Sequence, residues 1–282
     1  SGRRQQLFEE NLYDTGVSPN DKLDCSKVMK RVLVVIALIS FGVHAQERNL
    51  VWSDEFNGDA LDLTSWNFEL GDGCPNLCGW GNNERQVYTK ENHRLEDGKL
   101  IITAKKEGDW YTSTRITTQG KHEFQYGRME ARAKVAVGQG IWPAFWMLGS
   151  DIKEVGWPAC GEIDILEYVG REEDMVYTTL HVPAGHGDSA FSKKTKFEAI
   201  EEGYHVYAAE WSPEQIEFFV DDQSVFVFSP EDKSKAVWPF DQPFYFIINL
   251  AIGGNFGGPE VDDSIFPQEY AIDYVRVYEL EE

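Results

Sequence analysis

The chain has 282 residues, of which 42% are hydrophobic and 13% aromatic, enough for one large β domain or two small ones. Its net charge of −22 repels nucleic acid and anionic membranes, so neither is an expected partner, and a neutral ligand fits better. Nine tryptophans and 12 tyrosines suit a large core, but aromatic rings also stack on the apolar faces of sugars.

The first predicted element is a secretory signal. Met29 begins a segment with two basic residues, an apolar run from Val32 to Val43 and a small-residue site that ends at Ala45. The apolar run is shorter than the roughly 20 residues that span a membrane, and a buried core segment is the alternative. We expect a signal peptide at 29–45, an upstream extension at 1–28 outside the fold, and a secreted or periplasmic protein.

Residues 46–282 consist of short alternating segments with turn residues between them. Pairs such as Asp97-Gly98 and Asp221-Asp222 mark the turns. The absence of a fixed repeat and of a Pro/Ser linker favours one domain, and many strands with regular turns predict an antiparallel β-sandwich. We expect strands at 50–56, 99–106, 111–118, 124–135, 161–169, 177–182, 204–212, 215–222, 223–228, 244–254 and 270–280.

Three cysteines lie in this domain. Cys74 and Cys78 are close enough for a small-loop disulfide in an oxidising compartment, and a free pair is the alternative. Cys160 precedes an acidic stretch and has no base at a useful spacing. We therefore expect Cys160 to be a small buried residue rather than a nucleophile.

The segment GEIDILEYVG, residues 161–170, places three carboxylates within six residues. In a regular strand Glu162 and Asp164 share one face, whereas Glu167 points to the other. A β-bulge absorbs one extra residue and re-aims the side chains that follow it. We predict a bulge around Ile165-Leu166 that brings all three carboxylates onto one face.

Two facing carboxyl groups can cleave a glycosidic bond, one as nucleophile and the other as acid and base. In this interpretation Glu167 is the protonated member, and Asp164 orients Glu162 and shares a proton with it. Like charges this close titrate as a coupled set. The alternative at this point is an acidic outer strand that holds a calcium ion or no ligand.

Other segments supply groups that suit a neutral sugar. Trp142 and Trp146 share a face in either a strand or a helix, in position to stack on a pyranose ring. The loop at 79–89 is rich in planar hydrogen-bonding groups, including Asn83 and Arg85. His181 lies on the next expected strand after the acidic one, where pairing could bring it near Glu167.

The ordered set of LVWSDEFNG, GWGNNERQVYT, GIWPAFWMLG, GEIDILEYVG, NLAIGGNFGG and AIDYVRVYEL resembles the laminarinase-type members of glycoside hydrolase family 16. The resemblance extends from about residue 50 to residue 280. It implies an all-β jelly-roll β-sandwich with a concave substrate cleft, and retaining endo-hydrolysis of β-1,3-glucan without a cofactor for catalysis. Carried over by position, it makes Glu162 the nucleophile, Asp164 its assisting acid and Glu167 the acid/base, and assigns substrate contacts to Trp142, Trp146, Asn83, Arg85 and His181.

The same resemblance implies a structural calcium ion, with Glu55, the carbonyl of Gly98 and Asp273 as candidate ligands. An empty site or plain surface acids are the alternative. The extra residue Leu166 separates this chain from the shorter lichenase pattern and groups it with laminarinases, agarases and carrageenases.

The acidic net charge favours a glucanase over an enzyme for sulfated galactans. We expect a monomer that acts on neutral β-glucan, with mixed-linkage β-1,3-1,4-glucan as a second substrate. A galactanase of the same fold and a non-catalytic β-glucan-binding module are the alternatives. The binding module is disfavoured because the chain keeps both glutamates.

Overall fold

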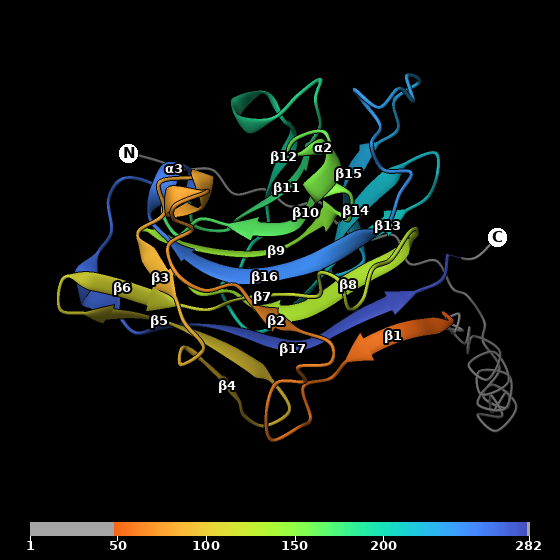
Figure 1. The fold of residues 1–282 in the computed structure, drawn as a ribbon. Coiled ribbons are helices and arrows are strands. Elements are labelled where there is room, and N and C mark those ends of the chain that lie inside the picture. Colours follow the sequence, from red (N-terminus) through yellow and green to blue (C-terminus); the bar gives the residue numbers. More distant parts are fainter. Residues whose placement is uncertain (1–47, 281–282) are drawn as a thin grey trace, which may run out of the picture. The chain divides into compact units, whose positions relative to one another are not determined.

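The computed structural model describes residues 48–280, which contain strands β1 to β17 and short helical turns (Figure 1). The extension at 1–28 and the predicted signal peptide at 29–45 lie outside the described residues. Within the described range, no helix has the length and apolar character needed to cross a membrane.

Ten strands form the first sheet, in the order β15-β14-β13-β8-β17-β5-β6-β3, with β1 beside β17 and β4 beside β5. All its pairs are antiparallel except β3 with β6. The strands are β1 (Leu50–Asp54), β3 (Gln86–Tyr88), β4 (His93–Leu95), β5 (Leu100–Glu107), β6 (Trp110–Ser113), β8 (Gly127–Lys134), β13 (His205–Trp211), β14 (Ile216–Val220), β15 (Gln223–Phe228) and β17 (Gln268–Tyr278).

The second sheet has seven strands in the order β12-β11-β10-β9-β16-β7-β2. Its central strands bend in Figure 1, so the face turned away from the first sheet is concave. We call this side the open face. The strands are β2 (Asn67–Phe68), β7 (Arg115–Thr117), β9 (Ile141–Gly149), β10 (Glu162–Tyr168), β11 (Met175–His181), β12 (Phe191–Lys196) and β16 (Phe244–Ile252).

The main core lies between the two sheets. Alternate residues of β9, such as Phe145 and Met147, join Met129 of β8 and Ile272 of β17 in one apolar cluster. The other side chains of β9 point to the open face, where Leu148 packs in a separate small cluster. This alternation buries one face of each sheet against the other and confirms the predicted antiparallel β-sandwich.

Two details differ from the expected strands. The segment 111–118 is not one strand, because β6 belongs to the first sheet and β7 to the second, and the chain passes between them at the buried Thr114. The Thr114 hydroxyl donates to the carbonyl of Thr89 at 2.7 Å. Strands β2, β3, β4, β9 and β12 are not among the expected strands, because β2 to β4 are only two or three residues long, β9 is apolar almost throughout, and β12 is mostly polar. The lysines of β12 suit an edge strand, where charge discourages further pairing.

The predicted bulge is confirmed in β10. Between the pairs Asp164–Thr179 and Glu167–Tyr177, β10 advances one residue further than β11. On its other side, β10 also has one residue more than β9 between the pairs Asp164–Trp146 and Leu166–Phe145. As a result the consecutive residues Ile165 and Leu166 both lie in the main core, with exposed fractions of 0%.

Truncation of either core side chain tests the bulge. We expect Ile165→Ala and Leu166→Ala each to lower the free energy of unfolding by about 3 kcal/mol, because each would leave a cavity in the core. Urea unfolding followed by tryptophan fluorescence measures both. A regular strand would bury only one of the two residues, so a neutral Leu166→Ala would contradict the bulge.

Candidate active site

The three carboxylates of β10 share the open face. Two glycines border this strand: Gly161 has a φ of 75°, and a Cβ on Gly170 would lie 1.8 Å from the carbonyl oxygen of Gly138. Beyond the bulge Glu167 is paired with Ala144, which belongs to the same face of β9 as the partners of Glu162 and Asp164. The bulge therefore gathers the three acids as the sequence predicted.

Glu162 is held by an indole that was not predicted. Trp157, in the loop between α2 (Ile152–Val155) and β10, donates its Nε1–H to Glu162 Oε2 at 2.7 Å. The Trp157 ring also lies 5.8 Å from the ring of His181, centroid to centroid. No alternating pattern marks this irregular loop, so only its position before the acidic segment could have suggested Trp157.

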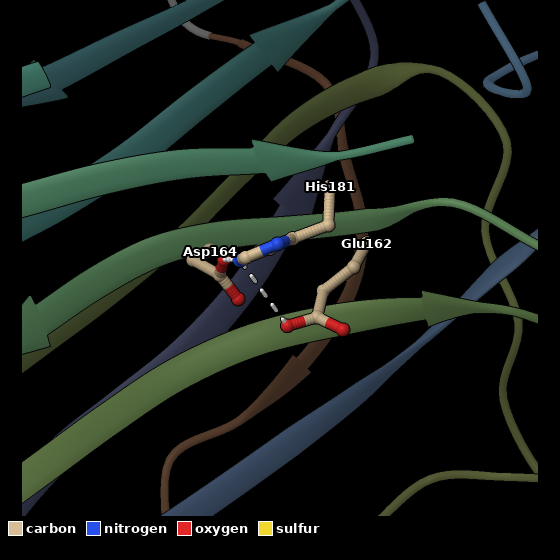
Figure 2. A group of neighbouring side chains, drawn as sticks. All are labelled: Glu162, Asp164 and His181. Atoms are coloured by element: carbon tan, nitrogen blue, oxygen red, sulfur yellow. Dashed lines mark ion pairs between the residues drawn. The ribbon is translucent and has the colours of Figure 1, made fainter. Parts of the chain in front are cut away.

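His181 approaches the cluster from β11 (Figure 2). Its Nε2 lies 3.3 Å from Asp164 Oδ2 and 3.9 Å from Glu162 Oε1. The register places His181 opposite Glu162, whereas Glu167 faces Tyr177. Strand pairing therefore does not set His181 directly beside Glu167, although the charge of His181 still acts on the Glu167 carboxyl group. The extra residue of the bulge pairs Glu167 with Tyr177, whereas the pairing of Glu162 with His181 precedes the bulge.

Asp164, which lies between Glu162 and Glu167 in the sequence, has a buried side chain. Its Oδ2 has no aligned hydrogen-bond partner, although His181 is nearby. A buried carboxylate oxygen without a donor favours a bound proton, because the charged form is poorly solvated. This placement suits a group that shares a proton with Glu162.

Glu167 is 9% exposed. It accepts hydrogen bonds from Trp142 Nε1 at 3.1 Å and from the Thr179 hydroxyl at 3.3 Å. The structure shows that Trp142 orients the carboxyl group, whereas its predicted stacking on a sugar stays a prediction. Thr179 has no signal of its own in the sequence.

Burial is the main reason that the carboxyl pKa values are raised. Burial raises the pKa of Glu162 to about 8, assisted by the charge of Asp164 and opposed by His181 and the Trp157 hydrogen bond. Burial also raises the pKa of Asp164. The pKa of Glu167 is raised well above its ordinary value by burial and by the charges of Asp164 and Glu162. Glu167 is therefore suited to carry a proton at neutral pH, as a general acid must.

Trp146 also lies on the open face, on β9 beside Asp164. Its Nε1 donates to Asn249 Oδ1 at 2.7 Å, and Asn249 in turn donates to the Tyr88 hydroxyl oxygen at 3.1 Å. Tyr88 donates to the buried Glu84 at 3.1 Å. This chain of hydrogen bonds fixes the Trp146 ring, and its members come from segments that no local pattern connects.

Asn83 and Arg85 contact the loop that follows β16. Asn83 donates to Asn255 Oδ1 at 2.8 Å, and Arg85 donates to the carbonyl of Pro259. Both side chains are exposed and hold this loop. Their predicted contacts with sugar stay a prediction.

The predicted calcium ligands are paired with arginines. Arg276 binds Glu55 through two hydrogen bonds of 2.8 Å, and Arg132 binds Asp273 at 2.6 Å. Gly98 occupies the turn before β5 with a φ of 68°. Because guanidinium groups already neutralise both carboxylates, these side chains fit a cation poorly as placed.

The carboxylate cluster itself includes side chains of the types that bind metals. Glu162, Asp164 and His181 have ligand-type atoms within 4.8 Å of one another, and no other such group of three occurs among residues 48–280.

The structure also answers the predictions for the cysteines. Cys74 and Cys78 form a disulfide. Cys160 is buried, and burial raises the pKa of its thiol to about 12.

The Trp157 hydrogen bond leads to a prediction on pH dependence. Its N–H stabilises the ionised form of Glu162, so Trp157→Phe should raise the pKa of this carboxyl group. Because a nucleophile must be ionised, the acid limb of the kcat/KM profile should move to higher pH by about one unit. Profiles of the two enzymes on one substrate measure the shift, and an unchanged acid limb would contradict this role.

Two neighbouring carboxyl groups with raised pKa values, Glu162 and Glu167, on a face that carries tryptophans, are typical of a glycoside hydrolase site. Comparison with known proteins agrees with this class. Residues 81–276 match the family model described as glycosyl hydrolases family 16. The chain is 40% identical over 278 residues to a beta-glucanase of Rhodothermus marinus, which covers 89% of this chain and 95% of that protein.

Solved structures are similar over nearly their full length. The laminarinase of Flavobacterium sp. UMI-01 has a TM-score of 0.81 and 67% identity, covering 82% of this chain and 100% of that one. The laminarinase catalytic domain of Thermotoga maritima MSB8 has a TM-score of 0.79 and 42% identity, covering 83% and 99%. The chain belongs to glycosyl hydrolase family 16, with its jelly-roll fold and a catalytic reaction that needs no cofactor.

Proposed function

We propose that this protein hydrolyses internal β-1,3-glucosidic bonds of laminarin-like glucans with retention of anomeric configuration. The observation that carries the proposal is the bulge in β10, which brings Glu162, Asp164 and Glu167 together on the open face. The enzymes called laminarinases among its structural neighbours support the choice of glucan.

In the first step, the ionised Glu162 attacks the anomeric carbon and forms an ester bond with the sugar. The bond to the leaving oxygen breaks, and Glu167 gives that oxygen its proton. The Glu167 carboxylate then removes a proton from water, and the resulting hydroxide equivalent displaces Glu162 from the anomeric carbon. The two inversions restore the starting configuration, and both carboxyl groups return to their first protonation states.

Asp164, His181 and Trp157 assist Glu162 in this scheme. Trp157 fixes the oxygen Oε2, which leaves Oε1 free to attack. Asp164 carries a proton that lowers the charge density around the nucleophile, and His181 stabilises negative charge on the pair. Three supports on one carboxylate suit a group that must form and then release an ester.

One experiment tests the substrate and the stereochemistry together. Laminarin, mixed-linkage β-glucan, agarose and carrageenan are incubated in parallel, and released reducing ends are measured. We expect the highest kcat/KM on laminarin and less on mixed-linkage glucan, with β-configured ends visible first by proton NMR. Release from agarose or carrageenan instead would favour the galactanase alternative, and binding of laminarin without release would favour a non-catalytic module.

The sequence supports further proposals on location and partners. The segment at 29–45 supports secretion or a periplasmic location, with 46–282 as a single catalytic domain. The net charge of −22 supports the absence of nucleic-acid and membrane partners, and a monomer is the simplest state. Because Arg276 and Arg132 already pair with Glu55 and Asp273, we expect neither added calcium nor EDTA to change the Tm.

A further inference from the structure

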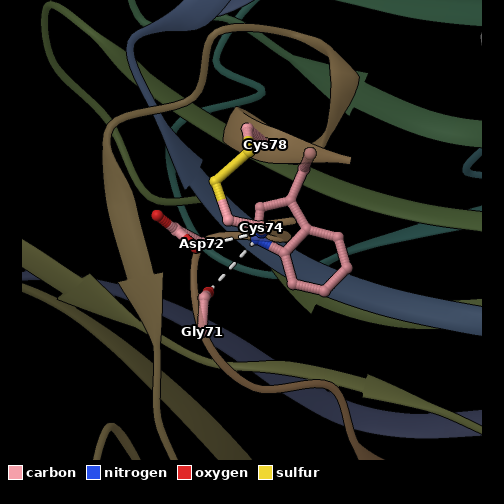
Figure 3. Close-up of a disulfide and its surroundings, with 5 residues drawn as sticks. Gly71, Asp72, Cys74 and Cys78 are labelled. Atoms are coloured by element: carbon pink, nitrogen blue, oxygen red, sulfur yellow. Dashed lines mark hydrogen bonds between the residues drawn. A yellow bond between two sulfur atoms is a disulfide. The ribbon is translucent and has the colours of Figure 1, made fainter. Parts of the chain in front are cut away.

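A disulfide closes the loop that precedes Trp80 (Figure 3). Cys74 and Cys78 are joined, and the second cysteine begins the short turn η1 (Cys78–Gly81). Trp80 lies in this turn and donates its Nε1–H to the carbonyl of Gly71 at 3.3 Å. The mechanism proposed above uses no residue of this loop.

Trp80 continues a stack that reaches the catalytic strands. The Arg115 guanidinium lies 4.5 Å from the Trp80 ring centroid and 5.0 Å from that of Trp146. Trp146 is paired with Asp164 across β9 and β10. The three side chains therefore form a continuous aromatic–cation–aromatic stack that extends from the carboxylates toward the disulfide loop.

Strand pairing sets the direction of this stack. Arg115 is paired with Asn249, Asn249 with Ala144, and Ala144 with Glu167, so the four residues form one row across β7, β16, β9 and β10. Adjacent strands are about 4.8 Å apart, which puts Arg115 roughly 14 Å from the backbone of Glu167. A linear polysaccharide bound across the strands at Glu167 would extend toward Trp80.

The positive charge of Arg115 in this stack is neutralised by an acidic partner. Arg115 has an almost buried side chain and pairs with Glu69 at 2.5 Å. Trp80 is half-buried and forms the outer end of the stack. An aromatic ring of this kind, with its supporting charge already paired, suits an uncharged sugar ring better than an ionic ligand.

Trp80 contacts Arg115 and Tyr88, but the turn that carries it has no buried residue. Gly79 and Trp80 have left-handed φ values of 61° and 52°. Backbone hydrogen bonds from Leu77 to Gly73, and from Gly79 to Asp72, close the loop beside the disulfide. A left-handed backbone at Trp80 is unfavourable for a residue with a side chain, so the turn gains from a further restraint, which the disulfide supplies.

We propose that Trp80 is a sugar-binding platform remote from the cleaved bond, and that the Cys74–Cys78 disulfide positions it. The inference rests on the proposed function and adds a preference for long chains. A short oligosaccharide that occupies only the region around Glu162 and Glu167 gains nothing from Trp80. A longer chain reaches the ring and binds more tightly.

The first test compares Trp80→Ala with Trp80→Phe and with the control Trp110→Ala. Trp110 is 68% exposed on β6 of the other sheet, so its removal controls for loss of a surface tryptophan. Steady-state kinetics are measured on laminarin and on the shortest β-1,3-oligosaccharide that the wild type cleaves. We expect Trp80→Ala to raise KM for laminarin about tenfold at unchanged kcat, with the short substrate unaffected. The phenylalanine variant should recover most of the affinity, and Trp110→Ala should behave as wild type.

The second test replaces both cysteines, as Cys74→Ser/Cys78→Ser. We expect the same rise in KM for laminarin only, with unchanged kcat and unchanged kinetics on the short substrate. Wild-type KM in this double variant would overturn the role of the disulfide. Wild-type KM in Trp80→Ala, or an equal loss on short and long substrates, would overturn the platform. If the wild type cleaves no β-1,3-glucan, the proposed function fails; if it does and these variants match it, only this inference fails.

Discussion

Glu162→Gln is expected to lower kcat on laminarin by about 10⁴-fold or more, the scale seen when an enzyme loses its nucleophile. The amide has nearly the same shape as the carboxylate, and its oxygen can still accept the hydrogen bond from Trp157. It cannot form the ester with the anomeric carbon. The loss should therefore appear on every substrate, including aryl glycosides with good leaving groups.

The control for this variant is Glu214→Gln, an exposed glutamate in the turn between β13 and β14. It makes the same chemical change far from β10 in the sequence and in a different sheet, and it should keep wild-type kcat. Thermal unfolding of both proteins shows whether the fold is kept. Laminarin hydrolysis near the wild-type rate in folded Glu162→Gln would overturn the assignment of the nucleophile.

Glu167→Gln is expected to lower kcat by a factor that depends on the leaving group of the substrate. On laminarin, kcat should fall by about 10³-fold, because the leaving sugar oxygen requires a proton and the attacking water requires a base. The leaving group of an activated aryl glycoside is an acidic phenol, which can depart as the phenolate without that proton. The first step on this substrate should therefore stay fast. The glycosyl-enzyme then accumulates, because no base activates water.

This difference is measurable as a burst. Rapid mixing of Glu167→Gln with an activated aryl β-glucoside oligomer should release about one phenol per enzyme and then turn over slowly. Mass spectrometry should detect the sugar attached to Glu162. Equal losses on the activated and natural substrates, without a burst, would show that Glu167 is not the acid/base.

The sequence predicted the sheet segments and the catalytic strand because both depend on local periodicity. Alternation located most of the strands, and Glu167, out of phase with Glu162, predicted the bulge. The structure confirms this at one place, where Ile165 and Leu166 both enter the core. A two-residue period is a property of consecutive side chains, so one extra residue can be detected without knowledge of the neighbouring strands.

The sequence could not predict which distant segments meet. Trp157 reaches Glu162 from an irregular loop, and Arg115 connects Trp80 with Trp146 only because the chain changes sheets at Thr114. His181 likewise faces Glu162 because of the register of β11 on the bulged strand.

The sequence by itself thus predicted the β-sandwich, the family resemblance and the three carboxylates that the bulge brings together on the open face. The tertiary structure decided which groups orient those carboxylates and which aromatic side chains lie further along the open face. The physical reason is that side-chain alternation is encoded locally, whereas the contacts around a site depend on strand register and loop paths between residues far apart in the chain.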